Sequence, residues 1–177
     1  MTARLRRPVS VRRLTGEEVH RIEASEPERA ALVEALDLVA LDALTADVAL
    51  RPWRGQGVRV TGTVRGAVVQ SCVVTLEPVP GTVEEEFDVR LHPDAAVAVS
   101  VEVDPDAPDP PEKLTGHEVD VGAICLEHFV LGLDPYPRAP GVEFEADESD
   151  GAEAKEPSPF AVLARLKNGG NRPRGGE

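Results

Sequence analysis

Histidine side chains are the first candidates for chemistry in this sequence, because they bind metals and transfer protons near neutral pH. The chain has four, and they share no spacing typical of metal ligands: His20, His92, His117 and His128. Glu127 and His128 are adjacent, so on a helix their side chains diverge and do not form a dyad. We therefore expect no metal site and no acid–base pair built on histidine.

The two cysteines, Cys72 and Cys125, are too few for a disulfide framework or for a four-ligand zinc site. Cys72 lies in an expected strand beside Val73 and Val74, and no cation is close to it in sequence. A lowered thiol pKa has no visible cause there, so we expect a small buried residue and two reduced thiols.

Carboxylates are abundant, but a chain with a net charge of −13 must contain many of them. Glu84 and Glu86 share the solvated face of an expected strand, which does not favour general acid–base catalysis. The sequence contains neither a glycine-rich phosphate loop nor a nucleophile elbow. These observations predict a protein that is not an enzyme and uses no cofactor.

The composition indicates one acidic domain of 177 residues, with 19 Lys and Arg against 32 Asp and Glu. This balance excludes a globally basic DNA-binding protein and one drawn to anionic membranes by bulk charge. No apolar run reaches the roughly 18 residues of a membrane span. The charged start at Met1–Pro8 is followed by no apolar stretch, so we expect no secretory signal and a cytoplasmic location.

The charge is unevenly distributed along the chain. Residues 1–70 hold eleven Arg against nine acidic residues, a net charge of +2. Residues 82–120 hold twelve acidic residues against two basic ones, a net charge of −10. Such asymmetry permits a local surface for a polyanion and an acidic surface for a cationic partner, but it is also typical of ordinary solvated faces.

A helix and several strands are expected to position these side chains. Ser25 and Glu28 form a capping box that starts a helix over residues 26–38. From residue 45 onwards apolar and polar residues alternate, which predicts strands. Further β-rich runs follow at 67–76, 83–91 and 97–103. The short breaks between them favour an antiparallel meander.

Within the first long run, Val58, Val60 and Val64 are expected to face the core, opposite Arg59 and Arg65. Gly62 also falls on the inward side, which suggests a bulge or the close approach of a neighbouring chain.

A second helix should begin at Asp120 and end at the Asp134–Pro137 turn, because a residue before proline avoids the helical region. Its buried face is expected to contain Ala123, Leu126, Val130 and Leu133. Ile124, Phe129 and Leu131 widen that stripe, so we expect this helix to be heavily buried between layers.

Together these elements predict an α+β fold, a curved antiparallel sheet of about five or six strands with two or three packed helices. The expected organisation has five parts: a flexible N-terminal arm (1–7), the α+β domain (8–142), an acidic linker (143–157), a C-terminal helix (158–168) and a disordered tail (169–177).

Three segments, in their order and spacing, resemble a known family: Ser71–Val79, Asp120–Gly141 and Pro157–Lys167. They resemble the YceD family, a bacterial and plastid domain, in its alphaproteobacterial form, and the likeness covers residues 8–167. Many relatives carry a Cys-x-x-Cys-Leu motif, whose second cysteine is Thr75 here, so no thiol pair or zinc role is expected. The resemblance implies structural roles for six positions: Cys72, Leu76, Asp134, Pro135, Pro137 and Phe160.

The resemblance also implies a non-catalytic ribosome-biogenesis factor that supports accumulation or processing of large-subunit rRNA, with that rRNA or a pre-ribosomal particle as its partner. The alternative is an acidic protein-binding module, such as an escort for a basic ribosomal protein, without direct RNA contact. The candidate contacts with RNA or a partner are six side chains: Arg12, Arg13, Arg59, Arg65, Tyr136 and Arg138.

Overall fold

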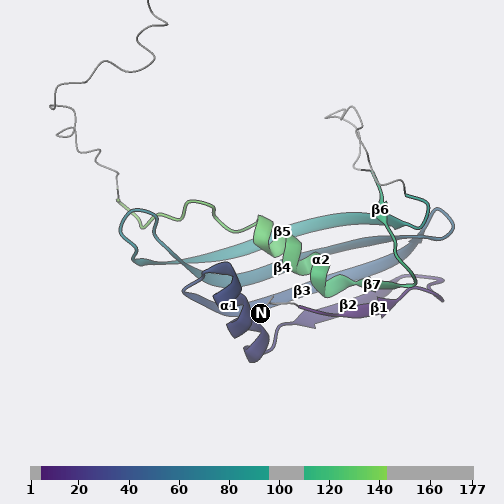
Figure 1. Cartoon of the computed structure of the whole chain (residues 1–177), viewed down its shortest axis with the longest axis horizontal. Coiled ribbons are helices and arrows are strands. Elements are labelled where there is room, and N and C mark those ends of the chain that lie inside the picture. Colours follow the sequence, from purple (N-terminus) through teal and green to yellow (C-terminus); the bar gives the residue numbers. More distant parts are fainter. Residues whose placement is uncertain (1–4, 96–109, 143–177) are drawn as a thin grey trace, which may run out of the picture. The chain divides into compact units, whose positions relative to one another are not determined.

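The computed structural model describes residues 5–95 and 110–142. Along the described chain (Figure 1) the elements are β1 (Pro8–Ser10), β2 (Glu18–Glu23), α1 (Glu26–Leu36), β3 (Ala40–Trp53), β4 (Gly57–Ser71), β5 (Pro78–His92), β6 (Glu112–Lys113), β7 (Glu118–Asp120) and α2 (Val121–Leu131). Several expectations lie outside the described residues: a strand over 97–103, the linker 143–157, the helix 158–168 with Phe160, and the tail 169–177.

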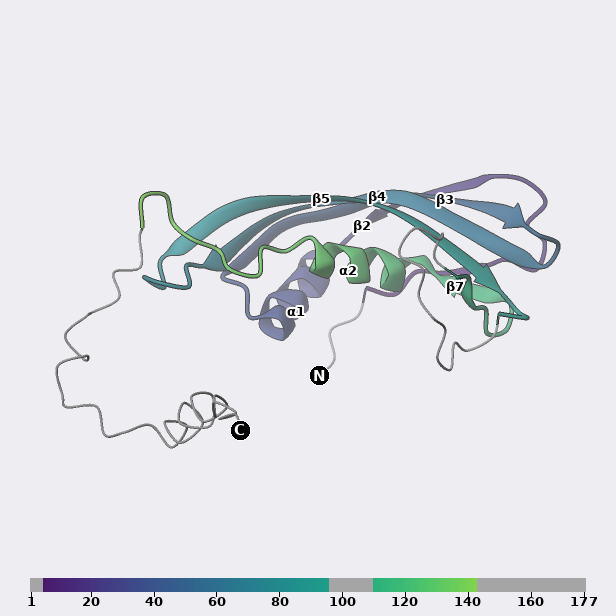
Figure 2. The same cartoon turned by 90° about the horizontal axis from the view of Figure 1, so that it is seen from above.

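The main sheet has five strands in the order β2-β3-β4-β5-β6. Strands β2 to β5 form the predicted antiparallel meander, while β6 joins β5 in parallel at Leu91 and His92. The sheet is open and curved, and both helices lie on its concave side (Figure 2). A separate antiparallel pair joins β1 to β7. These features confirm the predicted α+β fold and add one parallel pairing at the sheet edge.

The strands are longer than the sequence suggested. Runs that we expected to be separate merge in β4, which has 15 residues and pairs with β3 on one side and β5 on the other. At 3.2–3.4 Å per residue, a strand of this length spans about 45–50 Å. Sites at its two ends are therefore far apart on the same sheet.

The concave face of β4 carries the core. Val58, Val60 and Val64 are buried there, as their alternation predicted. Gly62 makes a close approach rather than a bulge, because a Cβ atom built on it would lie 2.6 Å from Cζ of Phe87 on β5. Four residues further on, a Cβ atom on Gly66 would lie 2.5 Å from Cε2 of Phe129 on α2. The two glycines thus make room for two aromatic rings.

Helix α2 buries only part of the face that we predicted: Phe129 is buried and Leu126 packs against the core, but Leu131 is 73% exposed. Its buried residues are Val121, Gly122, Cys125 and Phe129, whereas Ala123 and Val130 are exposed. The helix is apolar almost all round, so periodicity alone does not select a face. Two close contacts do select it: Phe129 rests on Gly66, and a Cβ atom on Gly122 would lie 2.3 Å from the Leu5 carbonyl oxygen. The helix also has one open side instead of lying between two layers.

Helix α1 follows its predicted start and ends two residues early. The capping box of Ser25 and Glu28 is present, and Leu32 is buried under β3. The helix stops at Leu36 because Asp37 adopts a left-handed conformation (φ 54°), which breaks the hydrogen-bonding pattern. Val39, between the helix end and β3, is 49% exposed.

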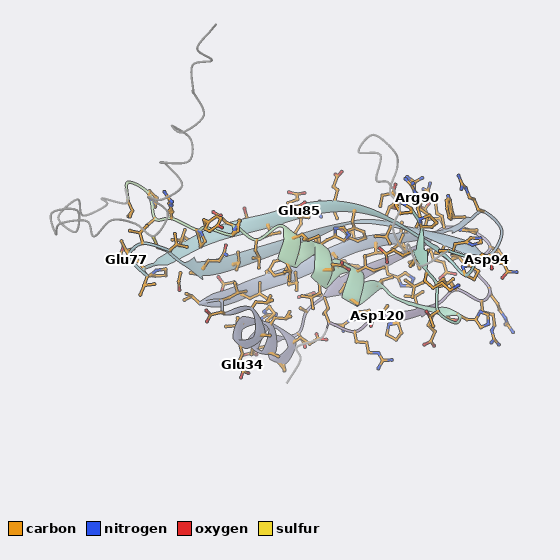
Figure 3. The ribbon with its side chains drawn as sticks, turned by 45° about the horizontal axis from the view of Figure 1, so that its top comes forward. Glu34, Glu77, Glu85, Arg90, Asp94 and Asp120 are labelled. Carbon is orange, nitrogen blue, oxygen red and sulfur yellow. The ribbon has the colours of Figure 1, made fainter. Side chains whose placement is uncertain are left out.

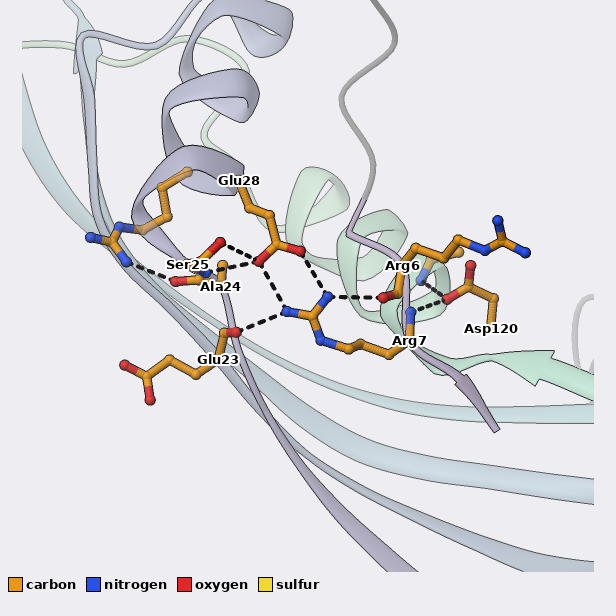
Figure 4. A network of polar contacts seen from close by, with 9 residues as sticks. Arg6, Arg7, Glu23, Ala24, Ser25, Glu28 and Asp120 are labelled. Carbon is orange, nitrogen blue, oxygen red and sulfur yellow. Dashed lines mark hydrogen bonds and ion pairs between the residues drawn. The ribbon is translucent and has the colours of Figure 1, made fainter. Parts of the chain in front are cut away.

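A polar network fixes the N-terminal segment to both helices (Figure 4). The Arg7 guanidinium donates to both Glu28 carboxylate oxygens, at 2.7 and 2.9 Å. The Arg7 backbone amide donates to Asp120, which also caps α2 by accepting from the Ala123 amide. Leu5 is only 2% exposed. Residues 5–7, which we expected in a flexible arm, are therefore packed against the domain.

We predict that Glu28→Gln lowers the free energy of unfolding by about 1 kcal/mol at neutral pH, since solvent partly screens this pair. The hydrogen bond from Arg7 lowers the pKa of Glu28 from 4.5 to about 2, with further contributions from Ser25. Because the folded-state pKa is the lower one, the ionised carboxylate stabilises the fold above pH 4.5, and this contribution is lost as the pH falls towards 2.

Urea unfolding at several pH values measures this effect. The difference in free energy of unfolding between the parent protein and Glu28→Gln should shrink as the pH falls from 4.5 towards 2. Glu34→Gln, an exposed position on the same helix, is the matched control and should change little at any pH. A constant difference across this range would contradict the proposed role of the ion pair.

We also predict that Gly66→Ala destabilises the protein by about 1–3 kcal/mol, because the added methyl group would displace Phe129 from the sheet. Gly81→Ala on β5 is the control, since its new Cβ atom would meet nothing closer than Val68 Cγ1 at 4.0 Å. Equal unfolding midpoints for the two variants would show that the contact between α2 and the sheet does not depend on Gly66.

Candidate functional site

The structure divides the predicted contact residues between the two ends of the main sheet. Arg12 lies beside the β3–β4 hairpin, where it shares a pocket with Gly55 and Pro93. Tyr136 and Arg138 lie at the other end, because the Val73 amide donates to the Pro137 carbonyl oxygen at 2.8 Å. Figure 3 marks these ends with Asp94 and Glu77. The six residues therefore do not form one surface.

The hairpin end carries an aromatic and cationic cluster. Arg54 (φ 44°) and Gly55 (φ 80°) form the turn, a conformation that favours glycine at the second position. The Arg54 guanidinium lies 4.6 Å from the centroid of the Trp53 ring, within the range of a cation–π interaction. The His92 ring meets Trp53 edge-on, with 6.1 Å between centroids, and its Nε2 is 3.2 Å from the Arg54 carbonyl oxygen.

A pocket of about 430 Å³ adjoins this cluster. It is lined by Arg12, by the hairpin residues Gly55 and Gln56, and by His117 from the loop before β7. Arg13 follows Arg12 in the same exposed turn. We call the set Arg12, Arg13, Trp53, Arg54 and His92 the hairpin-end surface.

The arginines on the convex face of the sheet are already paired with carboxylates. Arg59 donates to both oxygens of Asp88, at 2.8 and 2.7 Å, and this interaction lowers the pKa of Asp88. Arg65 lies 2.9 Å from Glu84 and 3.3 Å from Asp47. By contrast, Arg12, Arg13 and Arg54 form no ion pair with any other described residue. Phosphate oxygens would therefore compete with carboxylates at Arg59 and Arg65, whereas within residues 5–95 and 110–142 they would meet no such competitor at these three positions.

The opposite end of the sheet is organised by a turn at Cys72. The sequence suggested a strand through this residue, but β4 ends at Ser71 and the chain reverses over residues 72–77. The Cys72 amide donates to the Glu77 carbonyl oxygen at 2.8 Å, and Leu76 has a left-handed backbone (φ 62°). Val73 and Val74 therefore lie in a turn rather than in a β-ladder.

This turn lies next to the loop that holds Asp134, Pro135 and Pro137, which the family resemblance marked as structural together with Cys72; Phe160 lies outside the described residues. The Ala139 amide lies 3.4 Å from Cys72 Sγ, and the Gln70 side chain donates to the Asp134 carbonyl oxygen at 2.9 Å. The loop after α2 is thus fastened to the end of β4. Leu76 is an exception, because its side chain is 77% exposed.

The turn also supplies a cause for a lowered thiol pKa, which the sequence did not reveal. A hydrogen bond from the Thr75 side chain lowers the pKa of Cys72 to about 6, and the backbone amides of Ala139, Thr75 and Val74 act in the same direction. Cys125 shows the opposite effect, because burial on α2 raises its pKa to about 12, with a contribution from Asp120.

The remaining candidates for chemistry stay apart. His128 stacks on Phe87 with 5.0 Å between ring centroids, far from His92 in sequence and on a different element. In residues 5–95 and 110–142, no three metal-binding side chains converge. Neither helix in the described part is long and apolar enough to cross a membrane.

Sequence reasoning missed Trp53, Arg54 and His92. The two glycines that follow Trp53 and Arg54, Gly55 and Gly57, were a usable signal, because glycine between two runs of alternating residues indicates a turn. The partnership of Trp53 with His92 carries no signal in the sequence, because it depends on the pairing of β3, β4 and β5.

The two thiols should titrate far apart. We predict that thiolate ultraviolet absorbance rises with an apparent pKa of about 6 in the parent protein and that Cys72→Ala abolishes this step. Cys125→Ala should retain it, because Cys125 ionises only at about 12. The titration of Thr75→Val provides a second check, since removal of the hydroxyl should raise the pKa of Cys72. A single step near the ordinary thiol pKa would contradict both assignments.

Comparison with known proteins gives one family. The model for a family described as large ribosomal RNA subunit accumulation protein YceD matches residues 60–167. No curated protein and no solved structure matches the chain significantly. The matched segment is more than half of the 177 residues and contains most of β4, all of β5 and α2, and the loop bonded to the Cys72 turn. The chain therefore belongs to the YceD family.

Proposed function

We propose that this protein is a non-catalytic ribosome-biogenesis factor that supports the accumulation or processing of large-subunit rRNA in the cytoplasm. The observation that carries the proposal is the family match over residues 60–167, whose description names large-subunit rRNA accumulation.

We further propose that direct RNA contact occurs at the hairpin-end surface. Affinity for a polyanion comes mainly from cations that release counterions, and Arg12, Arg13 and Arg54 have no carboxylate partner among the described residues. Trp53 and the guanidinium plane of Arg54 offer stacking surfaces of the kind that unpaired bases use. With a net charge of −13, the protein is suited to a local contact rather than to wrapping around RNA.

The second candidate is an acidic module that escorts a basic ribosomal protein without touching RNA. The observation in its favour is the row of carboxylates that β5 presents to solvent, including Glu84, Glu86 and Asp88. Partners of opposite charge associate faster and more selectively. Glu84 and Asp88 are already paired with arginines, which weakens this candidate.

We predict that reversing charge at the hairpin end (Arg12→Glu, Arg13→Glu, Arg54→Glu) removes the tagged protein from immature large-subunit particles in a sedimentation gradient. In titrations with a large-subunit rRNA fragment, the slope of log K against log salt should become shallower by about 2–3 because three cationic contacts are lost. Loss of the gene should lower large-subunit rRNA relative to small-subunit rRNA.

The matched control changes two exposed residues at the far end of the sheet: Tyr136→Ala removes the aromatic ring and Arg138→Glu reverses the charge. This variant should sediment like the parent protein. If the control alone releases the protein from particles, the RNA contact lies at that end instead. Migration near the top of the gradient with a basic protein and no rRNA would favour the escort. Unchanged rRNA levels after gene loss would reject the proposed function as a whole.

A further inference from the structure

We propose that the outer face of α2 binds an amphipathic helix of a basic partner protein. We define this outer face by Ala123, Leu126, Glu127, Val130 and Leu131. The partner's apolar side would lie against α2, and its cationic side chains would meet the carboxylates at the rim. This inference concerns a surface lined by other residues than the hairpin-end surface and does not rest on the proposed RNA contact.

The outer face is more apolar than a solvated helix face needs to be. Of the eleven residues in α2, only Glu127 and His128 are polar, in a chain that is 29% charged. Leu131 is 73% exposed and Val130 is 39% exposed. Amphipathic helices on a protein surface normally carry charged residues on the side away from the core. A contiguous apolar patch therefore indicates an interaction site.

The patch forms a shallow, open groove of about 500 Å³. Leu5, which is buried beside the start of α2, contributes to it together with Ala123 and Leu126. Positions 123, 126, 127 and 130 follow the three- and four-residue spacing by which one helix accepts the side chains of another. The shape and spacing fit an approaching helix better than an extended strand.

The charges around the groove select the partner. Its two charged lining residues, Asp120 and Glu127, are both acidic. Beyond the end of α2, a Cβ atom on Gly132 would lie 2.5 Å from Cγ of Glu85, so a third carboxylate lies next to the helix. Asp120 and Glu85 lie near opposite ends of α2 (Figure 3). Two copies of the chain, each with a net charge of −13, would place identical carboxylates opposite one another, which disfavours self-association. A cationic helix would meet the same carboxylates with opposite charge, so it is the favoured partner.

The test uses the full chain and a fluorescent synthetic peptide of about five helical turns, with Leu along one side and Lys on the others. We expect saturable binding that weakens as salt is added. Leu131→Asp should weaken it about tenfold or more, because it places a charge where an apolar side chain would be buried. Glu127→Lys should weaken binding and reduce its salt dependence.

The matched control is Leu76→Asp, the same change at a leucine that is 77% exposed but lies in the Cys72 turn. It should bind the peptide like the parent protein. Because Leu131 is 73% exposed, its replacement leaves the core intact, which circular dichroism and urea unfolding would verify.

Four results would overturn the inference. One is equal binding of a peptide with Glu in place of Lys, and another is binding that Leu131→Asp does not change. A third is stronger peptide binding by Phe160→Asp, which would show that the chain's own C-terminal residues compete for this face. The last is a parent protein that sediments as a dimer, dissociates with Leu131→Asp and does not bind the peptide.

Discussion

The contact between Phe129 and Gly66 is the constraint on which the rest of this structure depends. Gly66 has no side chain on the concave face of β4, so the Phe129 ring lies directly against the sheet. A Cβ atom on Gly66 would lie only 2.5 Å from Cε2 of that ring. This contact sets the rotation of α2 about its own axis. It thereby decides that Cys125 is buried, that Val130 and Leu131 face solvent, and that Asp120 is placed to hold the N-terminal segment through Arg7.

The sheet keeps its two kinds of surface chemistry well apart. Along its convex face, arginines and carboxylates on neighbouring strands neutralise one another, as Arg59 and Asp88 do. At the hairpin tip the backbone turns sharply, and Arg54 stacks on Trp53. The strand register therefore accounts for the ion pairs along the sheet, whereas the described residues of the turn take no part in them.

Much of this architecture was determined by the sequence itself. The capping box at Ser25 and Glu28 specified where α1 begins, and alternation placed Val58, Val60 and Val64 in the core. Gly62 was expected to mark either a bulge or a close approach, and the structure has the close approach. These predictions succeeded because each depends on neighbours within a few residues, where backbone geometry and the hydrophobic pattern carry the information. The family resemblance also came from the sequence, and the match over residues 60–167 confirms it.

Only the tertiary structure decided which side of α2 is buried, why Cys72 lies in a turn, and which arginines pair with a carboxylate of the described chain. A helix that is apolar nearly all round has no preferred face of its own, so the choice belonged to Gly66 on a distant strand. The pKa of Cys72 depends partly on the Ala139 amide, which is 67 residues away in sequence. Arg59 is neutralised by Asp88 because β4 and β5 pair in one register. Local sequence determines the elements, whereas contacts between distant residues determine which side chains remain available for function.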